Sequence, residues 1–235
     1  MRAMKLLLPG ILLLGVAQAL ALVRQTENSK SKVLAKILAQ SQQLILVTTK
    51  DWNVVDGELL RYERVVNERV PTQQIWRPVG EKVAVVVGRS GMAWGRGLHG
   101  EPQVLAKSGD PIKKEGDGRS PAGAFMLNSA FGYAPLEQAV KIKLPYLQAT
   151  ATVECVDDPR STNYNRIVER EKVASPDWKS SEQMLRNDEL YRWGVVVDHN
   201  AIKPEAGAGS CIFLHIWSGM GKGTAGCTAM EAVKM

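Results

Sequence analysis

The sequence has 235 residues and a formal net charge of +6. That length is sufficient for one domain with a full hydrophobic core. The positive charge is small and spread along the chain, which excludes the concentrated basic surface of a nucleic-acid-binding protein. It suits a protein that works beside an anionic cell wall or membrane surface.

The N-terminal segment has the organisation of a secretory signal peptide. An almost wholly apolar run at residues 6–14 follows the positive charges of Arg2 and Lys5, and small residues that suit a cleavage site end at Ala21. The run is short for a membrane-spanning helix, so an uncleaved anchor is the weaker alternative. Residues 1–21 are therefore predicted to be removed, which leaves a periplasmic or secreted protein without an integral membrane span.

A short helix is predicted between the signal peptide and the main domain. Residues 22–43 are expected to be a linker that contains an amphipathic helix from Asn28 to Gln43, with Ser29 or Ser31 near its N-terminal cap. Its apolar side chains recur at helical spacing and fall on one face: Leu34, Ile37 and Leu38.

From residue 44 the periodicity changes to that of strands, and residues 44–235 are predicted to form one domain. Strands are expected at residues 44–49, 59–64 and 82–87, with a turn at residues 77–80. Glycine and proline separate these closely spaced segments. The pattern predicts a mainly β fold with a mostly antiparallel core.

Two turn-rich segments follow these strands. Residues 88–100 are predicted to form a surface loop with an exposed His99, because the spacing of a phosphate-binding loop is absent. Residues 110–123 are charged and rich in turn-forming residues, and a strand is expected at residues 124–127. A long charged segment between two strands is often functional, although a solvated hairpin explains it equally well.

The C-terminal part combines a polar segment with two core strands. Residues 155–192 are predicted to be a long polar insertion with one short helix at residues 180–190. Core strands are expected at residues 193–198 and 210–215. A further helix is expected to begin directly after Cys227, where its N-terminal dipole would favour a thiolate.

The sequence contains three cysteines, at positions 155, 211 and 227. In an oxidising compartment an odd number leaves one free thiol or an intermolecular bond. We expect a disulfide between Cys155 and Cys211 and a free Cys227. Sequence spacing does not determine the pairing, and three reduced cysteines are the alternative.

The free cysteine and a histidine form a candidate catalytic pair. His215 ends an apolar strand, and a glycine-rich loop leads from it to the Gly226–Cys227 corner. A thiolate is the nucleophile in such pairs, and a neighbouring imidazole takes its proton. Backbone N–H groups at the corner are candidates for stabilising a tetrahedral oxyanion. The alternative is that both side chains are ordinary core residues.

A zinc site is a weaker hypothesis for the same region. His199, His215 and Cys227 are possible ligands, but none of the usual zinc-ligand spacings occurs. No metal or other cofactor is therefore expected.

Two motifs resemble those of the L,D-transpeptidase (YkuD-like) catalytic domain family. That family carries a histidine followed by [Ser/Thr]-x-Gly-Cys, and a loop of the form Gly-Asp-Gly-[Lys/Arg]-Thr-Pro-x-Gly-x-Phe. The matching segments, which stand in the same order here, are His215 with Thr224-Ala225-Gly226-Cys227, and Gly116-Asp117-Gly118-Arg119-Ser120-Pro121-Ala122-Gly123-Ala124-Phe125. The resemblance covers roughly residues 80–230.

The resemblance implies a mainly β sandwich or barrel with a few short helices, and peptidoglycan stem peptides as substrate. Cys227 would be the nucleophile, His215 the base, and Gly226 part of the corner that presents the thiol. The family often orients its histidine with a backbone carbonyl, which here would belong to Ile216 or Trp217.

Three features depart from the family pattern. Only eleven residues separate His215 from Cys227, and the usual basic residue after the cysteine is absent. Related domains usually continue beyond the point at which this sequence ends, so the resemblance implies a shortened or incomplete C-terminus. The residues predicted to bind substrate are Arg119, Trp217, Thr224 and His199.

Three functions are compatible with these observations. The first is an exported L,D-transpeptidase that forms a thioester at Cys227. The second is an L,D-carboxypeptidase or endopeptidase on the same scaffold, with water as the acceptor. The third is a non-catalytic wall-binding module with an inert Cys227. The sequence contains no indication of an oligomeric state.

Overall fold

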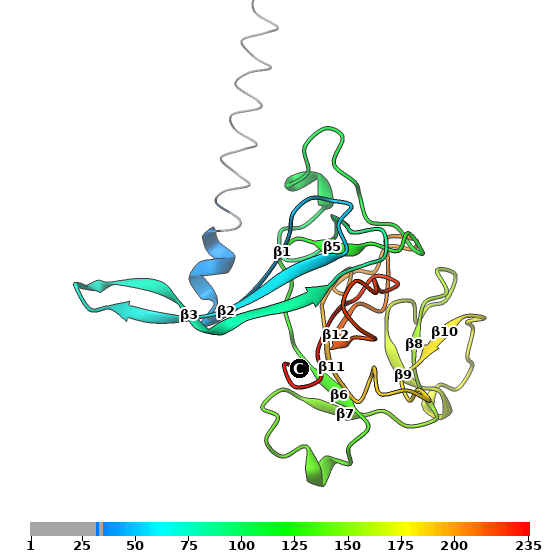
Figure 1. Cartoon of the computed structure of the whole chain (residues 1–235). Helices are drawn as coiled ribbons and strands as arrows, with labels where there is room; N and C mark the ends of the chain where they lie inside the picture. The colour runs from blue at the N-terminus through cyan, green and yellow to red at the C-terminus, as the bar shows by residue number, and fades with distance from the viewer. Residues whose placement is uncertain (1–31, 33–34) are drawn as a thin grey trace, which may run out of the picture. The chain divides into compact units, whose positions relative to one another are not determined.

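The computed structural model describes Lys32 and residues 35–235 (Figure 1). The predicted signal peptide and the predicted cap of the N-terminal helix lie outside the described residues. Residues 35–40 are helical, within the segment for which a helix is predicted. They belong to an N-terminal unit that ends at Gln40, and Ser41–Met235 forms a second compact unit.

The second unit is mainly β, as predicted. Its largest sheet has the strand order β1-β2-β3-β13-β12-β11-β6-β7, and two smaller sheets have the orders β10-β8-β9 and β4-β5. The strands are β1 (Gln43–Thr49), β2 (Asp56–Asn67), β3 (Val70–Val86), β4 (Met92–Trp94), β5 (Ser120–Ala122), β6 (Ala130–Gly132), β7 (Tyr146–Gln148), β8 (Val153–Val156), β9 (Ile167–Glu169), β10 (Ser181–Gln183), β11 (Trp193–Val196), β12 (Phe213–Ile216) and β13 (Thr228–Met230). Short 3-10 turns occur at Pro102–Val104, Leu136–Gln138 and Arg170–Lys172.

Most neighbouring strands of the large sheet are antiparallel, as the sequence predicted, but the pairs β12–β13 and β6–β7 are parallel. Parallel neighbours cannot be joined by a tight hairpin, so the chain must return to the starting end of the sheet. Residues 217–227 make this return. The glycine-rich loop after His215 is therefore the crossover that brings Cys227 back beside β12.

The turn predicted at residues 77–80 is wrong. These residues lie inside β3, which forms a long hairpin with β2 that projects from the sheet (Figure 1). Arg77 forms an ion pair with Glu63 of β2, and Arg64 lies 5.0 Å from the Trp76 ring centroid. Pro78 is tolerated because this outer part of β3 pairs with β2 alone.

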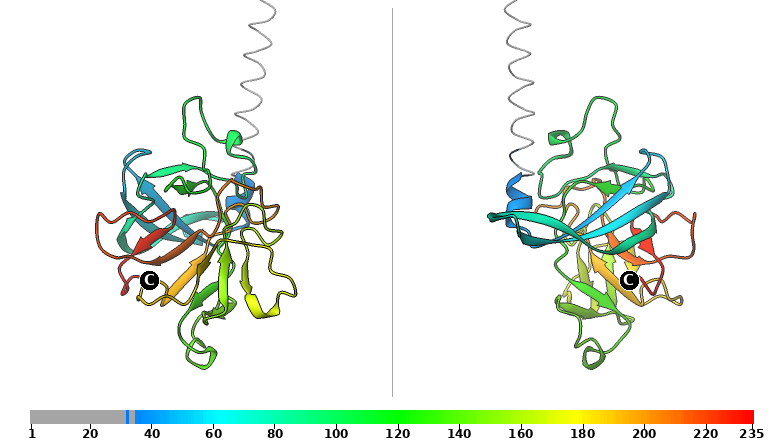
Figure 2. Two further views of the ribbon diagram at one scale, coloured as in Figure 1. Left: turned by 90° about the vertical axis from the view of Figure 1, so that its right-hand side faces the viewer. Right: turned by 60° about the vertical axis from the view of Figure 1, so that its left-hand side comes forward.

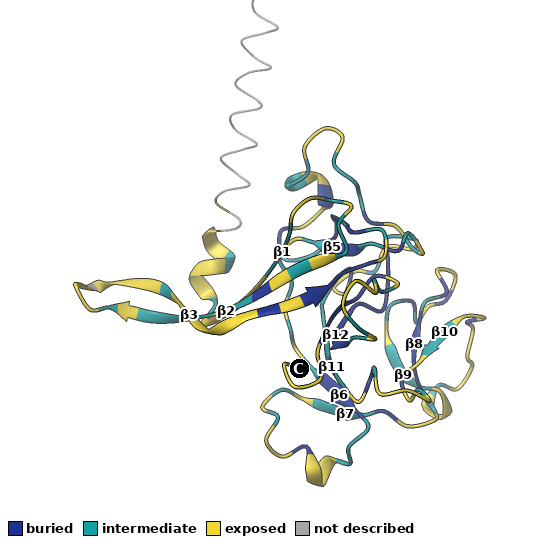
Figure 3. Ribbon diagram, in the orientation of Figure 1, coloured by how far each residue is buried: buried dark blue, intermediate teal, exposed yellow. Residues whose placement is uncertain are grey.

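Two apolar clusters cover the two faces of the large sheet. Leu214 and Met230 pack on one face with Leu59, Val83 and Val85. The other cluster lies between the large sheet and the three-stranded sheet. Its buried members include Phe131, Phe213, Cys227, Val153, Cys155, Met184 and Tyr191. Both turned views of Figure 2 show the three-stranded sheet beside the large sheet, and Figure 3 shows β8 and β12 as buried.

Two further predicted elements are absent. Residues 124–127 form no strand, because their backbone bonds to loops: the Ala124 N–H donates to His99, and the Asp198 N–H donates to Met126. The helix predicted at residues 180–190 is also wrong. Ser181–Gln183 instead forms β10 against β8, so the predicted polar insertion contains most of a small sheet. Pairing with β8 outweighs the weak helical tendency of this segment.

The predicted disulfide between Cys155 and Cys211 is confirmed, and Cys227 is free and buried. The disulfide ties β8 of the small sheet to the segment that leads into β12. Cys211 has a φ of +54°, which is incompatible with a strand, so β12 begins at Phe213 rather than at the predicted residue 210.

Candidate functional site

Cys227 stands directly before a strand, not before a helix. Thr228–Met230 forms β13, which pairs with β12 on one side and with β3 on the other. This central, fully buried position overrides the helix-forming character of the residues that follow Cys227. The predicted helix dipole at the sulfur is therefore absent.

The register of β12 and β13 places Cys227 and His215 on the same face of the sheet. His215 pairs with Ala229 and Leu214 with Thr228, so Cys227 stands level with Phe213. The Phe213 N–H donates to Cys227 Sγ at 3.3 Å. Alternate residues of a strand face the same side, and His215 is therefore the diagonal neighbour of Cys227.

The imidazole of His215 is held by the backbone. Nδ1 lies 2.7 Å from the Ile216 carbonyl oxygen, and because a carbonyl only accepts, Nδ1 carries the proton. Nε2 is then the nitrogen with a free lone pair. Burial lowers the pKa of His215, so the ring is neutral near pH 7. The orienting carbonyl is one of the two that the resemblance indicated.

The Cys227 thiol is protonated in this environment. Burial raises its pKa to about 12, and the negative charge of Glu182 acts in the same direction. The Phe213 N–H and the Tyr191 hydroxyl oppose this shift. The sulfur lies 3.6 Å from the Cys211 carbonyl oxygen, to which the S–H can donate. The site therefore contains a neutral thiol and a neutral imidazole rather than a preformed ion pair.

Side chains from two loops hold the Gly226–Cys227 corner. Thr224 Oγ1 donates to the Cys227 carbonyl at 2.6 Å and accepts from the Gly226 N–H at 3.1 Å. Ser120 Oγ donates to the same carbonyl at 2.8 Å. A Cβ on Gly226 would lie 3.2 Å from the Arg119 carbonyl oxygen, which is closer than ordinary contact. The Gly226 N–H is thus already bonded and is not free to bind an oxyanion.

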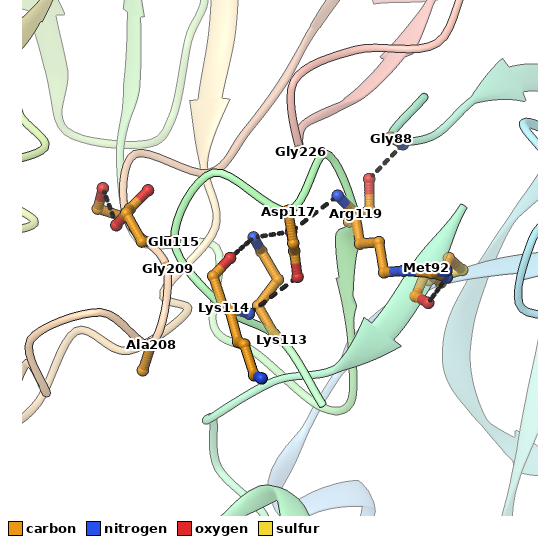
Figure 4. Close-up of polar contacts among 12 residues, drawn as sticks. Gly88, Met92, Lys113, Lys114, Glu115, Asp117, Arg119, Ala208, Gly209 and Gly226 are labelled. Carbon is orange, nitrogen blue, oxygen red and sulfur yellow. Dashed lines mark hydrogen bonds and ion pairs between the residues drawn. The ribbon is translucent and has the colours of Figure 1, made fainter. Parts of the chain in front are cut away.

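The Gly-Asp-Gly loop lies beside Gly226, and Figure 4 shows the polar contacts of Lys113, Asp117 and Arg119 within it. Asp117 accepts from Lys113 Nζ at 2.6 Å and from the Arg119 N–H at 2.9 Å. The Arg119 guanidinium donates to the carbonyls of Trp52 and Met92, both at 2.9 Å. The charged loop of the second motif therefore supports the Gly226–Cys227 corner.

The structure places the other predicted substrate-binding residues differently. His199 is buried, and its two ring nitrogens contact the Arg96 N–H and the Ala208 carbonyl. Trp217 is half-buried at the start of the crossover, and its backbone N–H donates to the Met230 carbonyl. His99 is only 2% exposed, so the prediction of a surface histidine is wrong. Its ring bonds the Gly95 carbonyl and the Ala124 N–H, which draws it inward.

Sequence reasoning missed Tyr191 and Glu182. The Tyr191 ring packs against His215 with centroids 5.1 Å apart, and its hydroxyl donates to Glu182 at 2.5 Å. Both residues come from the segment interpreted as a polar insertion. The signal available in the sequence was Tyr191 itself, an aromatic residue two positions before the predicted core strand.

No group of three or more His, Cys, Asp or Glu side chains among the described residues is arranged to hold a metal ion. No helix in the described part of the chain is long and apolar enough to cross a membrane. Comparison of the chain with protein-family models, with curated proteins and with solved structures found no match.

Proposed function

We propose that residues 44–235 are the catalytic domain of an exported L,D-transpeptidase of the YkuD-like β-sandwich type, acting on peptidoglycan stem peptides. The observation that carries the proposal is the pair of Cys227 and His215 on one face of adjacent strands, with the imidazole oriented by the Ile216 carbonyl. A disulfide beside the site supports an oxidising, extracytoplasmic location.

The protonated thiol determines how such an enzyme would start its reaction. With a thiol pKa of about 12, the thiolate is scarce near pH 7. His215 Nε2 would take the proton as Sγ attacks the carbonyl carbon of an L,D peptide bond. The C–S bond forms, the C–N bond breaks, and the imidazolium returns the proton to the departing amine. An acceptor amine then attacks the thioester and releases Cys227.

Substrate recognition in this proposal cannot use Arg119 without breaking the loop that it holds. Arg119 also donates to Asn53 at 2.8 Å, so both terminal nitrogens of its guanidinium are engaged in support. Thr224 acts on the corner itself, and His199 is buried with both nitrogens in use. Trp217 is the member of the predicted set that is left for contact with a stem peptide.

A non-catalytic wall-binding module is the second candidate function. The observation that favours it is the burial of Cys227 together with the raised pKa of its thiol. A carboxypeptidase or endopeptidase would use the same pair and differ only in water as the acceptor.

Acylation of the thiol separates these functions. The mature protein, incubated with a carbapenem that acylates this family, should gain one adduct in intact-mass analysis, and peptide mapping should place it on Cys227. Cys227→Ala should remain folded and gain none. A folded, reduced parent protein that gains no adduct would contradict the proposal and favour the binding module. With purified muropeptides, new cross-links identify transfer, and shortened stems identify hydrolysis.

A further inference from the structure

Tyr191 connects the candidate catalytic pair to a carboxylate that the mechanism above does not use. The Tyr191 ring is buried and packs nearly perpendicular to the rings of His215 and Phe213, at centroid distances of 5.1 and 5.7 Å. Phe213 is the residue whose N–H donates to Cys227 Sγ. The Tyr191 hydroxyl donates to Glu182 Oε1 at 2.5 Å. Tyr191 thus contacts His215, the residue whose N–H bonds Cys227 Sγ, and the Glu182 carboxylate.

Glu182 is in the middle of β10, where it pairs with Cys155 of β8. Its nearest cation is Arg186, whose guanidinium lies 3.6 Å from Oε1 but is shared with Asp188. Burial raises the pKa of the Glu182 carboxyl, and the nearby charge of Asp157 adds to this effect. Five other charged or titratable groups influence the pKa of Cys227, His215 or Glu182. They are Lys113, Asp157, Arg186, Asp188 and Tyr191.

The Tyr191 hydroxyl has one proton and two possible acceptors. While Cys227 is a neutral thiol, its S–H faces the Cys211 carbonyl and the Tyr191 proton goes to Glu182. A thiolate at Cys227 has no proton and becomes a strong acceptor. Tyr191 and Cys227 belong to the same buried cluster, and the Tyr191 hydroxyl acts on the thiol as a hydrogen-bonding group. A hydroxyl rotates about its C–O bond, so the same proton can then be donated to Sγ. The charge of Glu182 opposes thiolate formation, and the Tyr191 hydroxyl favours it.

We propose that Tyr191 is a positioning residue that shares its hydroxyl proton between Glu182 and Cys227 Sγ, and that this pair sets how readily Cys227 reacts. The inference deepens the proposed function and rests on it for its role in acyl transfer. Its chemical content, the opposite influence of two neighbours on one thiol, is measurable without any substrate.

The test measures how the alkylation rate of Cys227 by iodoacetamide depends on pH, with the ultraviolet absorbance of the thiolate as a second readout. Cys227 is the one thiol outside the disulfide, so the signal is unambiguous. Glu182→Gln should shift the profile to lower pH, and Tyr191→Phe should shift it to higher pH. Below the midpoint, each shift of one pH unit changes the rate about tenfold. We expect changes of roughly three- to tenfold, of opposite sign.

Glu189→Gln is the matched control, since this exposed glutamate pairs with Arg192 and leaves the site untouched. Its profile should coincide with that of the parent. Circular dichroism establishes that each variant is folded. If Tyr191→Phe fails to fold, the direction of the Glu182→Gln shift decides the question alone.

Shifts of the same sign in both variants would overturn the inference, because a merely structural role predicts a common loss. A Glu182→Gln profile that coincides with that of the parent would overturn it as well. Failure of the proposed function gives a different result: the two profiles diverge as expected, but neither carbapenem adduct nor muropeptide product forms.

Discussion

At the residue scale, the corner before β13 depends on small groups with defined partners. A side chain at Gly226 would place its Cβ 3.2 Å from the Arg119 carbonyl oxygen, so this carbonyl would have to move by a few tenths of an ångström. Thr224 closes the corner by bonding the carbonyl of Cys227 and the N–H of Gly226. Thr224 and Gly226 therefore shape the backbone beside Cys227, and the proposed reaction is left to Cys227 and His215.

Thr224→Val tests this role, because it keeps the shape of the side chain and removes the hydroxyl. The Gly226 N–H then loses its acceptor, and the Cys227 carbonyl keeps only its bond to Ser120. The free energy of unfolding should fall by about 1–2 kcal/mol, and carbapenem acylation should slow. Urea unfolding and timed intact-mass analysis measure both effects. Thr224→Ser should restore them, and a Val variant equal to the parent would refute the assignment.

At the element scale, two connections determine where the candidate pair of Cys227 and His215 lies. The parallel pairing of β12 with β13 sets Cys227 level with Phe213. The disulfide joins β8 to Cys211, whose carbonyl faces the thiol and whose N–H donates to Asn165 at 2.9 Å. The small sheet thereby covers the face on which the pair stands.

Removing the disulfide should weaken the packing of the small sheet against the large sheet. Replacing Cys155 and Cys211 by serine in a Cys227→Ser background prevents exchange with the third thiol. The free energy of unfolding should then fall by about 2–4 kcal/mol relative to Cys227→Ser alone, since the bond closes a long loop. Urea unfolding at constant pH gives the difference. Equal midpoints for the two proteins would show that the small sheet docks without the bond.

At the scale of the whole molecule, buried histidines link stability to pH. His199 joins three segments far apart in sequence, through the Arg96 N–H, the Ala208 carbonyl and a ring contact with Phe125. Burial lowers its pKa to about 4 from the ordinary value of 6.5. The unfolded chain therefore binds a proton between these values that the folded chain excludes.

Stability should accordingly fall as the pH decreases from about 6.5 to about 4, and the His199 contribution to this loss is about 3 kcal/mol. Burial of His215 adds to the loss in the same direction. Urea unfolding at several pH values measures the slope. His199→Gln, which cannot take up the proton, should show a shallower slope than the parent. An unchanged slope would assign the acid sensitivity to other groups.

Local chemistry in the sequence was sufficient for several conclusions. A buried apolar run next to a histidine, and a glycine beside a cysteine, identified β12, His215 and the Gly226–Cys227 corner without reference to the rest of the chain. The odd number of cysteines predicted a free thiol, and the expected pairing of Cys155 with Cys211, which spacing alone does not determine, is the one in the structure. Strand periodicity predicted the mainly β class, because side chains of a half-buried strand alternate between two environments.

Tertiary structure decided the features that depend on partners distant in sequence. The residues after Cys227 became β13 because β3 and β12 offered backbone partners on both sides. Residues 77–80 became strand because β2 continues opposite them. Tyr191 and Glu182 joined the site only when the small sheet packed over β12. Strand pairing, side-chain burial and the pKa of a thiol all depend on neighbours that are distant in sequence. The positions of these neighbours are determined only when the chain folds.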